Sequence, residues 1–142
     1  MIKLFNPMIL VFILASGFFL PGTTAAAEPA APNDPYYTNQ RYLSQIRAPE
    51  AWDYIASLEK DLAKVTVAVV DTGVDLTHPD LKDRLVEGTN VLSPGKPPQD
   101  DNGHGTAVAG VIAANANNGI GIAGIAPNAQ IMPIKAIGSK GV

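Results

Sequence analysis

Apolar runs separated by polar and glycine-rich stretches set the expected order of secondary structure. Residues 65–70 are apolar and rich in β-branched side chains, which is typical of a strand buried on both faces. Residues 129–137 form a similar run around Pro133, and residues 85–92 can hold a further strand. Residues 104–114 are small and apolar, as in a tightly packed helix. Alternating strands and helices predict a three-layer α/β fold with a mainly parallel sheet.

The region before the first of these strands has less periodicity. Residues 34–46 carry three tyrosines without a helical or strand period, so residues 28–47 are expected to be an extended N-terminal segment on the body. Pro49 suits the first position of a helix. Apolar residues then recur at near-helical spacing and give one apolar face, namely Trp52, Ile55, Leu58 and Leu62. The pattern predicts a helix from Pro49 to near Lys64.

Residues 1–27 have the features of a secretory signal peptide. Lys3 gives a weakly positive start, residues 8–20 are mainly apolar, and Ala25-Ala26-Ala27 offers a cleavage site. A membrane anchor is the alternative, but this apolar run is shorter than the roughly 20 residues that a spanning helix needs. Pro21-Gly22 also interrupts it. We therefore expect a secreted, extracellular protein without stable membrane association after signal removal.

Composition excludes some partners. The 142 residues include no cysteine, carry a formal net charge of −3 and are 46% apolar, which is typical of a globular protein. An exported chain without disulfides relies on its core, on bound ions, or on both. The mild negative charge offers no basic surface, so no nucleic-acid partner is expected.

A carboxylate stands where the first strand ends. Asp71 follows the apolar run, which places it at the carboxyl edge of a parallel sheet, where α/β proteins build their sites. A carboxylate there can accept the N–H of an imidazole, hold its tautomer and stabilise the imidazolium. The alternative is an aspartate that caps the turn leading to Gly73.

The matching imidazole is His104, which lies between two glycines at the start of the expected helix. Small neighbours leave room for a partner or a substrate, and a first helical turn gives the ring a rigid mount. A lone histidine is usually a polar surface residue, but Asp71 in its own suitable context favours a functional pair. Asp71 and His104 are therefore the candidate catalytic residues, two of the three members of a serine-hydrolase triad.

Four ordered blocks resemble the subtilases, the subtilisin-like serine proteases. They are Val67–Asp75, His78–Leu81, Asn102–Thr106 and Gly121–Pro127. Two earlier blocks, Asn33–Tyr37 and Ala48–Trp52, are similar to the thermitase branch of that family. The resemblance implies a subtilisin-like fold that is incomplete in this chain, with residues 48–142 as the N-terminal, truncated part of the catalytic domain. It also implies that Asp71 orients His104, which acts as the general base and later as the acid.

The resemblance also implies a nucleophile that these residues do not supply. Subtilases carry it in a Gly-Thr-Ser-x-Ala motif well after the histidine, whereas the serine after His104 here is Ser139, in a loop-like context. We expect a secreted serine endopeptidase for protein or peptide substrates, a monomer when complete, present here as an inactive fragment. The alternative is a catalytically inert, truncated secreted polypeptide with at most residual calcium binding.

Calcium is the cofactor that the thermitase-like blocks imply. The resemblance implies three side-chain ligands, from Asp34, Asp80 and Asn118. It also implies three main-chain carbonyl ligands, from Asn115, Ile120 and Ile122. Oxygen ligands of these kinds suit a hard cation. Such a site would tie the N-terminal segment to the body. A solvated Asn/Gly turn over residues 115–124 is the alternative.

The remaining polar residues allow a third, metallohydrolase interpretation. Its ligands would be Asp71, Asp75, His78, Asp80 and His104, although a compact ligand motif such as H-E-x-x-H is absent from the sequence. In the subtilase interpretation Asp75 caps a turn and His78 is structural. Asp100 and Asp101 are expected to form a solvated loop edge with some effect on His104, and Ala107, where many relatives have histidine, is expected to change little.

Overall fold

The computed structural model describes residues 30–58, 62–126 and 128–141, so the expected signal peptide over residues 1–27 lies outside the described residues. In chain order the elements are η1 (Tyr37–Asn39), α1 (Arg41–Gln45), α2 (Ala48–Ser57), β1 (Val65–Asp71), η2 (Lys82–Arg84), β2 (Thr89–Asn90), α3 (His104–Ala113) and β3 (Ala129–Lys135).

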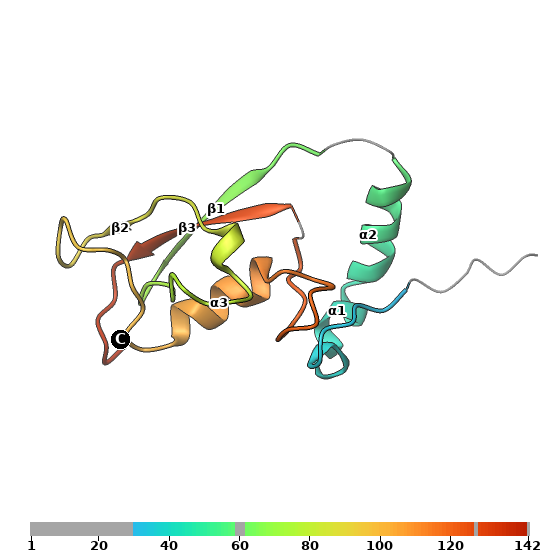
Figure 1. Cartoon of the computed structure of the whole chain (residues 1–142), viewed down its shortest axis with the longest axis horizontal. Helices are drawn as coiled ribbons and strands as arrows, with labels where there is room; N and C mark the ends of the chain where they lie inside the picture. Colours follow the sequence, from blue (N-terminus) through green and yellow to red (C-terminus); the bar gives the residue numbers. More distant parts are fainter. Residues whose placement is uncertain (1–29, 59–61, 127, 142) are drawn as a thin grey trace, which may run out of the picture.

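The three strands form one parallel sheet in the order β1-β3-β2 (Figure 1). β1 and β3 pair over their whole length, from Val65 opposite Ala129 to Asp71 opposite Lys135, and Asn90 of β2 also pairs with Lys135. The parallel α/β class predicted from the sequence is therefore confirmed. Because parallel strands end at one edge, Asp71, Asn90 and Lys135 lie together at the carboxyl edge of the sheet.

The core lies between one face of this sheet and α3, which runs below the strands in Figure 1. Val69 and Ile131 of the sheet contact a cluster that includes Ala109 and Ala113 of the helix, and all four side chains are buried. Small helical side chains let the helix axis approach the sheet closely. Burial of this face fixes the position of α3, and therefore of its first residue, relative to the end of β1.

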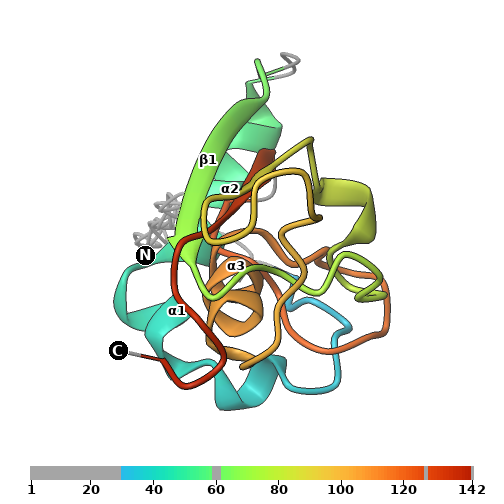
Figure 2. The same cartoon turned by 90° about the vertical axis from the view of Figure 1, so that its left-hand side faces the viewer.

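The prediction that β1 is buried on both faces is wrong for the described part of the chain. Val70 is 59% exposed, and Thr66 and Ala68 on the same face of the strand are exposed too, whereas Val69 is 4% exposed. Side chains alternate between the two faces of a strand. The face toward α3 is covered at Val69 and Asp71 but not at Val65, which is 63% exposed at the start of the strand, and no described element buries the opposite face. Figure 2 shows β1 along the outside of the molecule.

The expected extended N-terminal segment instead contains η1 and α1. Leu43 of α1 is buried against Ala48 and Ala123, which makes a second, smaller core. A five-residue helix is shorter than the 11 to 18 residues over which a helical period can be recognised, so the sequence pattern did not show it. α2 begins near Pro49 as predicted but ends at Ser57. Residues 62–64 are irregular and exposed, which corrects the expected end near Lys64.

Candidate active site

The catalytic candidates meet at the carboxyl edge of the sheet. Asp71 is the last residue of β1 and His104 the first of α3, and His104 Nδ1 lies 2.8 and 2.9 Å from the two carboxylate oxygens of Asp71. The Thr72 N–H also donates to Asp71 Oδ1, at 2.7 Å. The Asp71 side chain is 12% exposed and that of His104 is 66% exposed. A buried carboxylate thus holds an imidazole whose outer part is open to solvent.

The electrostatics of Asp71 favour its ionised form. Burial acts to raise the pKa of this carboxyl, but the hydrogen bonds from His104 and from the Thr72 N–H outweigh it, and the pKa is lowered. An ionised carboxylate only accepts hydrogen bonds, so the neutral imidazole places its proton on Nδ1. Nε2 of His104 is then the free acceptor, which is the arrangement that a general base requires.

Two glycines allow the strand end and the helix start to approach each other. A Cβ on Gly105 would lie 2.1 Å from the carbonyl oxygen of Gly73 and 3.1 Å from Cβ of Asp71. Gly73 itself has a φ of +104°, and its Cβ would lie 2.6 Å from the carbonyl oxygen of Pro98. The sequence suggested that glycines beside His104 leave room for a partner. For Gly105 that partner is the backbone next to Asp71.

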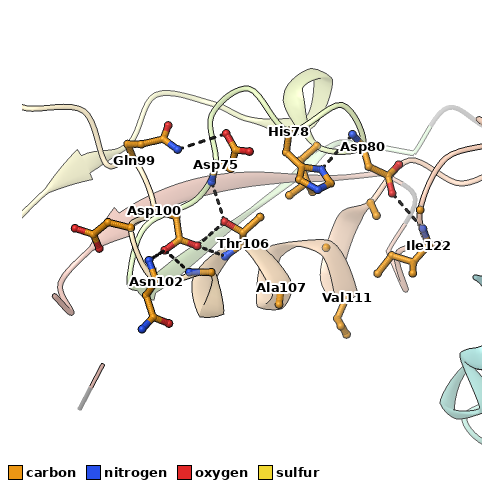
Figure 3. A pocket seen from close by; sticks show the side chains of 16 residues that line it. Asp75, His78, Asp80, Gln99, Asp100, Asn102, Thr106, Ala107, Val111 and Ile122 are labelled. Atoms are coloured by element: carbon orange, nitrogen blue, oxygen red, sulfur yellow. Dashed lines mark hydrogen bonds between the residues drawn. The ribbon is translucent and has the colours of Figure 1, made fainter. Parts of the chain in front are cut away.

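Asp100 is not the solvated loop edge that the sequence predicted. Its carboxylate accepts five hydrogen bonds, from Thr72 Oγ1, the N–H groups of Asn102, Gly103 and Thr106, and Thr106 Oγ1. Figure 3 shows Asp100 beside Asn102 and Thr106. Burial acts to raise its pKa, but the Thr106 hydroxyl and the backbone N–H groups hold the pKa far below its usual range. The prediction failed because charge and neighbouring glycines alone do not show which donors a loop carboxylate will meet.

Lys135 is a further residue that the sequence did not single out. It ends β3, its side chain is 8% exposed, and its ammonium donates to the Thr72 carbonyl and, at 2.6 Å, to Asp101 Oδ1. The available signal was a charged residue at the end of a mainly apolar strand. Asp101 is 52% exposed at its side chain. Asp101 therefore neutralises the buried ammonium group of Lys135, which lies next to Thr72.

The expected calcium ligands lie around one loop. Asp34 and Asp80 are 4% and 1% exposed. Asp34 accepts the N–H groups of Asn117 and Asn118 at 2.9 and 3.1 Å, while Asp80 accepts Asn118 Nδ2 at 2.7 Å and the Ile122 N–H at 3.2 Å. The structure thus brings together Asp34, Asp80 and the Asn118 side chain.

The other expected calcium ligands occupy the same loop in different ways. The Ile120 N–H donates to Asn118 Oδ1 at 2.8 Å. Asn115 donates its N–H to the Asp80 carbonyl at 3.0 Å and accepts Arg84 Nε at its side chain at 2.6 Å. The Asn115 side chain is therefore turned to Arg84.

The metallohydrolase interpretation is not supported. Among residues 30–58, 62–126 and 128–141, no group of three or more histidine, cysteine or acidic side chains is arranged to hold a metal ion. Asp75 instead caps the turn at Thr77, and His78 Nδ1 accepts the Asp80 N–H at 3.3 Å, as the structural roles of both residues require. Asp75 and His78 line a cavity of about 770 Å³ beside α3, to which Ala107 also contributes (Figure 3).

The lowered pKa of Asp71 predicts a loss of stability in acid. An unfolded aspartate, with a pKa of about 3.9, takes up its proton at a higher pH than folded Asp71 does. The stabilisation is thus fully present above the unfolded pKa and is lost as pH falls through the folded pKa. Below about pH 4, the free energy of unfolding of the Asp71→Asn variant should therefore fall less steeply with pH than that of the wild type. Urea unfolding between pH 7 and pH 3 measures this, with Asp83→Asn as a control for lost charge; parallel profiles would contradict it.

The parallel α/β sheet carries the Asp–His pair at its carboxyl edge, and comparison with known proteins gives the family. The model of the Subtilase family matches residues 63–142, so the chain belongs to the subtilases. Over 111 residues it is 45% identical to thermitase of Thermoactinomyces vulgaris and 42% identical to the thermophilic serine proteinase of Bacillus sp. (strain AK1). It is therefore a subtilase close to the thermitase branch, as its sequence blocks predicted.

A solved structure agrees with this assignment. A protease from Pseudoalteromonas arctica superimposes with a TM-score of 0.64 at 30% sequence identity, covering 79% of this chain and 40% of that protein. The sequence matches cover 78% of this chain but 38% of thermitase and 27% of the AK1 proteinase. The matched part of the chain thus spans well under half the length of these relatives.

Proposed function

We propose that the whole protein is a serine endopeptidase that hydrolyses peptide bonds in proteins or peptides, with Asp71 and His104 as two members of its triad. The observation that carries this proposal is the pair of contacts, 2.8 and 2.9 Å, between His104 Nδ1 and the carboxylate of Asp71. Membership of a family whose relatives are serine proteases supports the reaction class.

The two residues have distinct tasks in this reaction. His104 Nε2 takes the hydroxyl proton of a serine as the serine oxygen attacks the substrate carbonyl, and it then gives that proton to the leaving amine. Asp71 holds the Nδ1 proton in place and stabilises the positive ring that forms in between. Ser139 does not supply this serine in the structure: its contact near the site is made by its main-chain carbonyl, which accepts Asn102 Nδ2 at 2.9 Å, and no hydrogen bond among the described residues joins its hydroxyl to His104.

Sequencing the coding DNA beyond codon 142 tests the proposal. We expect the reading frame to continue into a Gly-Thr-Ser-x-Ala segment that supplies the nucleophile. A stop codon directly after Val142 would contradict it and would support the alternative, a catalytically inert secreted polypeptide. The alternative is kept because, within the part of the chain that the structure describes, no serine hydroxyl is hydrogen-bonded to His104.

Secretion and a monomeric state are part of the proposal. The sequence features of residues 1–27 support export, and the absence of cysteine leaves core packing and bound ions to stabilise the exported chain. Among the described residues, no helix combines the length and apolar character needed to cross a membrane.

The N-terminus of protein recovered from the culture medium should be Glu28, and light scattering should give the mass of one chain. A chain that retains Met1 and stays in the cell would contradict export.

We also propose that the loop around Asp80 binds a structural calcium ion. Asp34 and Asp80 are almost fully buried, and neither belongs to an ion pair with lysine or arginine among the described residues. Buried carboxylates without a cation are costly, so a divalent ion would stabilise them. The Asn118 amide donates its Nδ2 to Asp80 at 2.7 Å and accepts the Ile120 N–H at its oxygen; to present that oxygen to an ion, the amide would turn and give up the Ile120 N–H.

Calcium is then expected to stabilise the folded protein. At a free concentration of 100 times Kd, an ion that binds only the folded state adds about 2.7 kcal/mol to the free energy of unfolding. The melting temperature of the wild type should therefore be higher in excess calcium than in a chelator, and the same should hold for Asp83→Asn. The melting temperature of Asp80→Asn should be the same in both conditions. Equal melting temperatures of the wild type in the two conditions would contradict the site.

A further inference from the structure

Asp100 connects the two segments that carry the catalytic pair. One oxygen accepts the Thr72 hydroxyl at 2.8 Å, and Thr72 directly follows Asp71. The other oxygen accepts both the N–H and the hydroxyl of Thr106, in the first turn of α3 (Figure 3). A single carboxylate therefore holds the residue after the catalytic aspartate and the helix start that bears His104.

The connection has a second part, which runs through the hydroxyl of Thr72. Thr72 Oγ1 donates its only proton to Asp100 and accepts the Gly105 N–H at 2.9 Å. Because an ionised carboxylate cannot donate, it fixes the direction of this hydroxyl and leaves its lone pair for Gly105. Thr72 is 2% exposed, so water cannot replace these contacts readily.

The position of His104 depends on these anchors. Its side chain is 66% exposed, and the ring contacts Asp71 on one edge only. The neighbours that fix the helix start are the N–H groups of Gly105 and Thr106, and both donate to the Thr72 and Asp100 pair. A displacement of about 1 Å in a catalytic group can lower a rate by about 100-fold.

We propose that Asp100 is a positioning residue of the active site, whose carboxylate fastens the first turn of α3 to Thr72 and so holds His104 against Asp71. The inference rests on the proposed protease function for its effect on rate. Its geometric part does not depend on that function.

An amide at this position should fail to do the same. Every partner of Asp100 is a donor, two of them hydroxyls and three of them backbone N–H groups. Asn has the same shape, but one of its two terminal groups is itself a donor. In either amide orientation that group meets at least one backbone N–H, which leaves a donor without an acceptor. Asp100→Asn therefore removes the connection without creating a cavity.

The test compares Asp100→Asn with Asp83→Asn, an exposed aspartate of η2, in the full-length protein. Steady-state kinetics on a peptide substrate should show kcat lowered by about 10- to 100-fold in Asp100→Asn, with KM changed less than about threefold. Asp83→Asn should match the wild type. Thr106→Val removes only the hydroxyl and should lower kcat in the same direction, whereas Thr106→Ser keeps the hydroxyl and should restore it.

A second measurement separates positioning from the protease function. The proton on His104 Nδ1 lies in a short bond to an ionised carboxylate and should give a proton resonance far downfield, assigned by its loss in His104→Ala. In Asp100→Asn this resonance should broaden or move, even if the wild type hydrolyses no peptide. A folded Asp100→Asn protein with wild-type resonance and wild-type kcat would overturn the proposal. If Asp100→Asn does not fold, unchanged values in Thr106→Val would overturn it equally.

Discussion

His104→Ala is expected to lower kcat by about 10⁶-fold in the full-length protein, and Asp71→Asn by about 10⁴-fold. These magnitudes were measured on subtilisin, a member of this family, and on a related triad; the structure supplies the reason for them. Without His104 no base accepts the serine proton. In Asp71→Asn an amide N–H would face Nδ1 of the ring, which favours the tautomer with its proton on Nε2. That ring cannot act as a base.

The matched control for this prediction is the other histidine. His78 accepts the Asp80 N–H through Nδ1 and lies in the wall of the cavity beside α3, away from Asp71. His78→Ala should therefore keep kcat/KM within a fewfold of the wild type. Initial rates on a chromogenic peptide, measured with protein shown by circular dichroism to be folded, give all three values. A His104→Ala variant that keeps more than about one hundredth of the activity would contradict the assignment.

Gly105→Ala is expected to damage the protein more than any other change of one methyl group in α3. The new Cβ would lie 2.1 Å from the Gly73 carbonyl oxygen, where both partners are buried backbone and neither can rotate away. Either α3 moves off the end of β1 or the Gly73 turn shifts. Overpacking of this kind costs about 1–3 kcal/mol and can cost more. Both movements would also separate His104 from Asp71, so activity should fall with stability.

Gly110→Ala, in the same helix, provides the control. Its Cβ would meet Ile122 Cδ1 at 3.6 Å, an ordinary van der Waals contact, and Gly110 lies in the helix interior. Alanine is favoured over glycine there by about 1 kcal/mol, so this variant should be as stable as the wild type or more so. Denaturant unfolding gives both values. Equal stabilities for the Gly105 and Gly110 variants would show that the close approach to Gly73 is not a constraint.

The sequence predicted the parts of this structure that depend on regular periodicity or on short motifs. β1, α3 and β3 lie close to their expected bounds, because each is a run of apolar residues with clear ends. The Asp71 and His104 pairing could be anticipated because parallel strands and the following helices place such residues at one edge. The family blocks then gave the expected roles, and the family itself is confirmed.

Features that depend on contacts between distant segments could not be predicted in this way. α1 is too short to show a period, and its burial comes from Ala123, much later in the chain. Asp100 looked like a solvent-facing acid because the sequence does not show that Thr72, just after the end of β1, and the turn that follows Asp100 would both donate to its carboxylate. Lys135 looked like the end of a strand, and its pairing with Asp101 is visible only once β3 lies beside β1.

The most direct measurement is the reaction of the full-length protein with a serine-reactive phosphonate, followed by intact mass. If Asp71 and His104 activate a serine, the wild type should gain one adduct on a single serine, and His104→Ala should react at least about 1,000-fold more slowly. The His78→Ala variant should react at the wild-type rate. No adduct on the folded wild type, or equal rates with and without the His104 imidazole, would contradict the assignment of this pair to a serine endopeptidase.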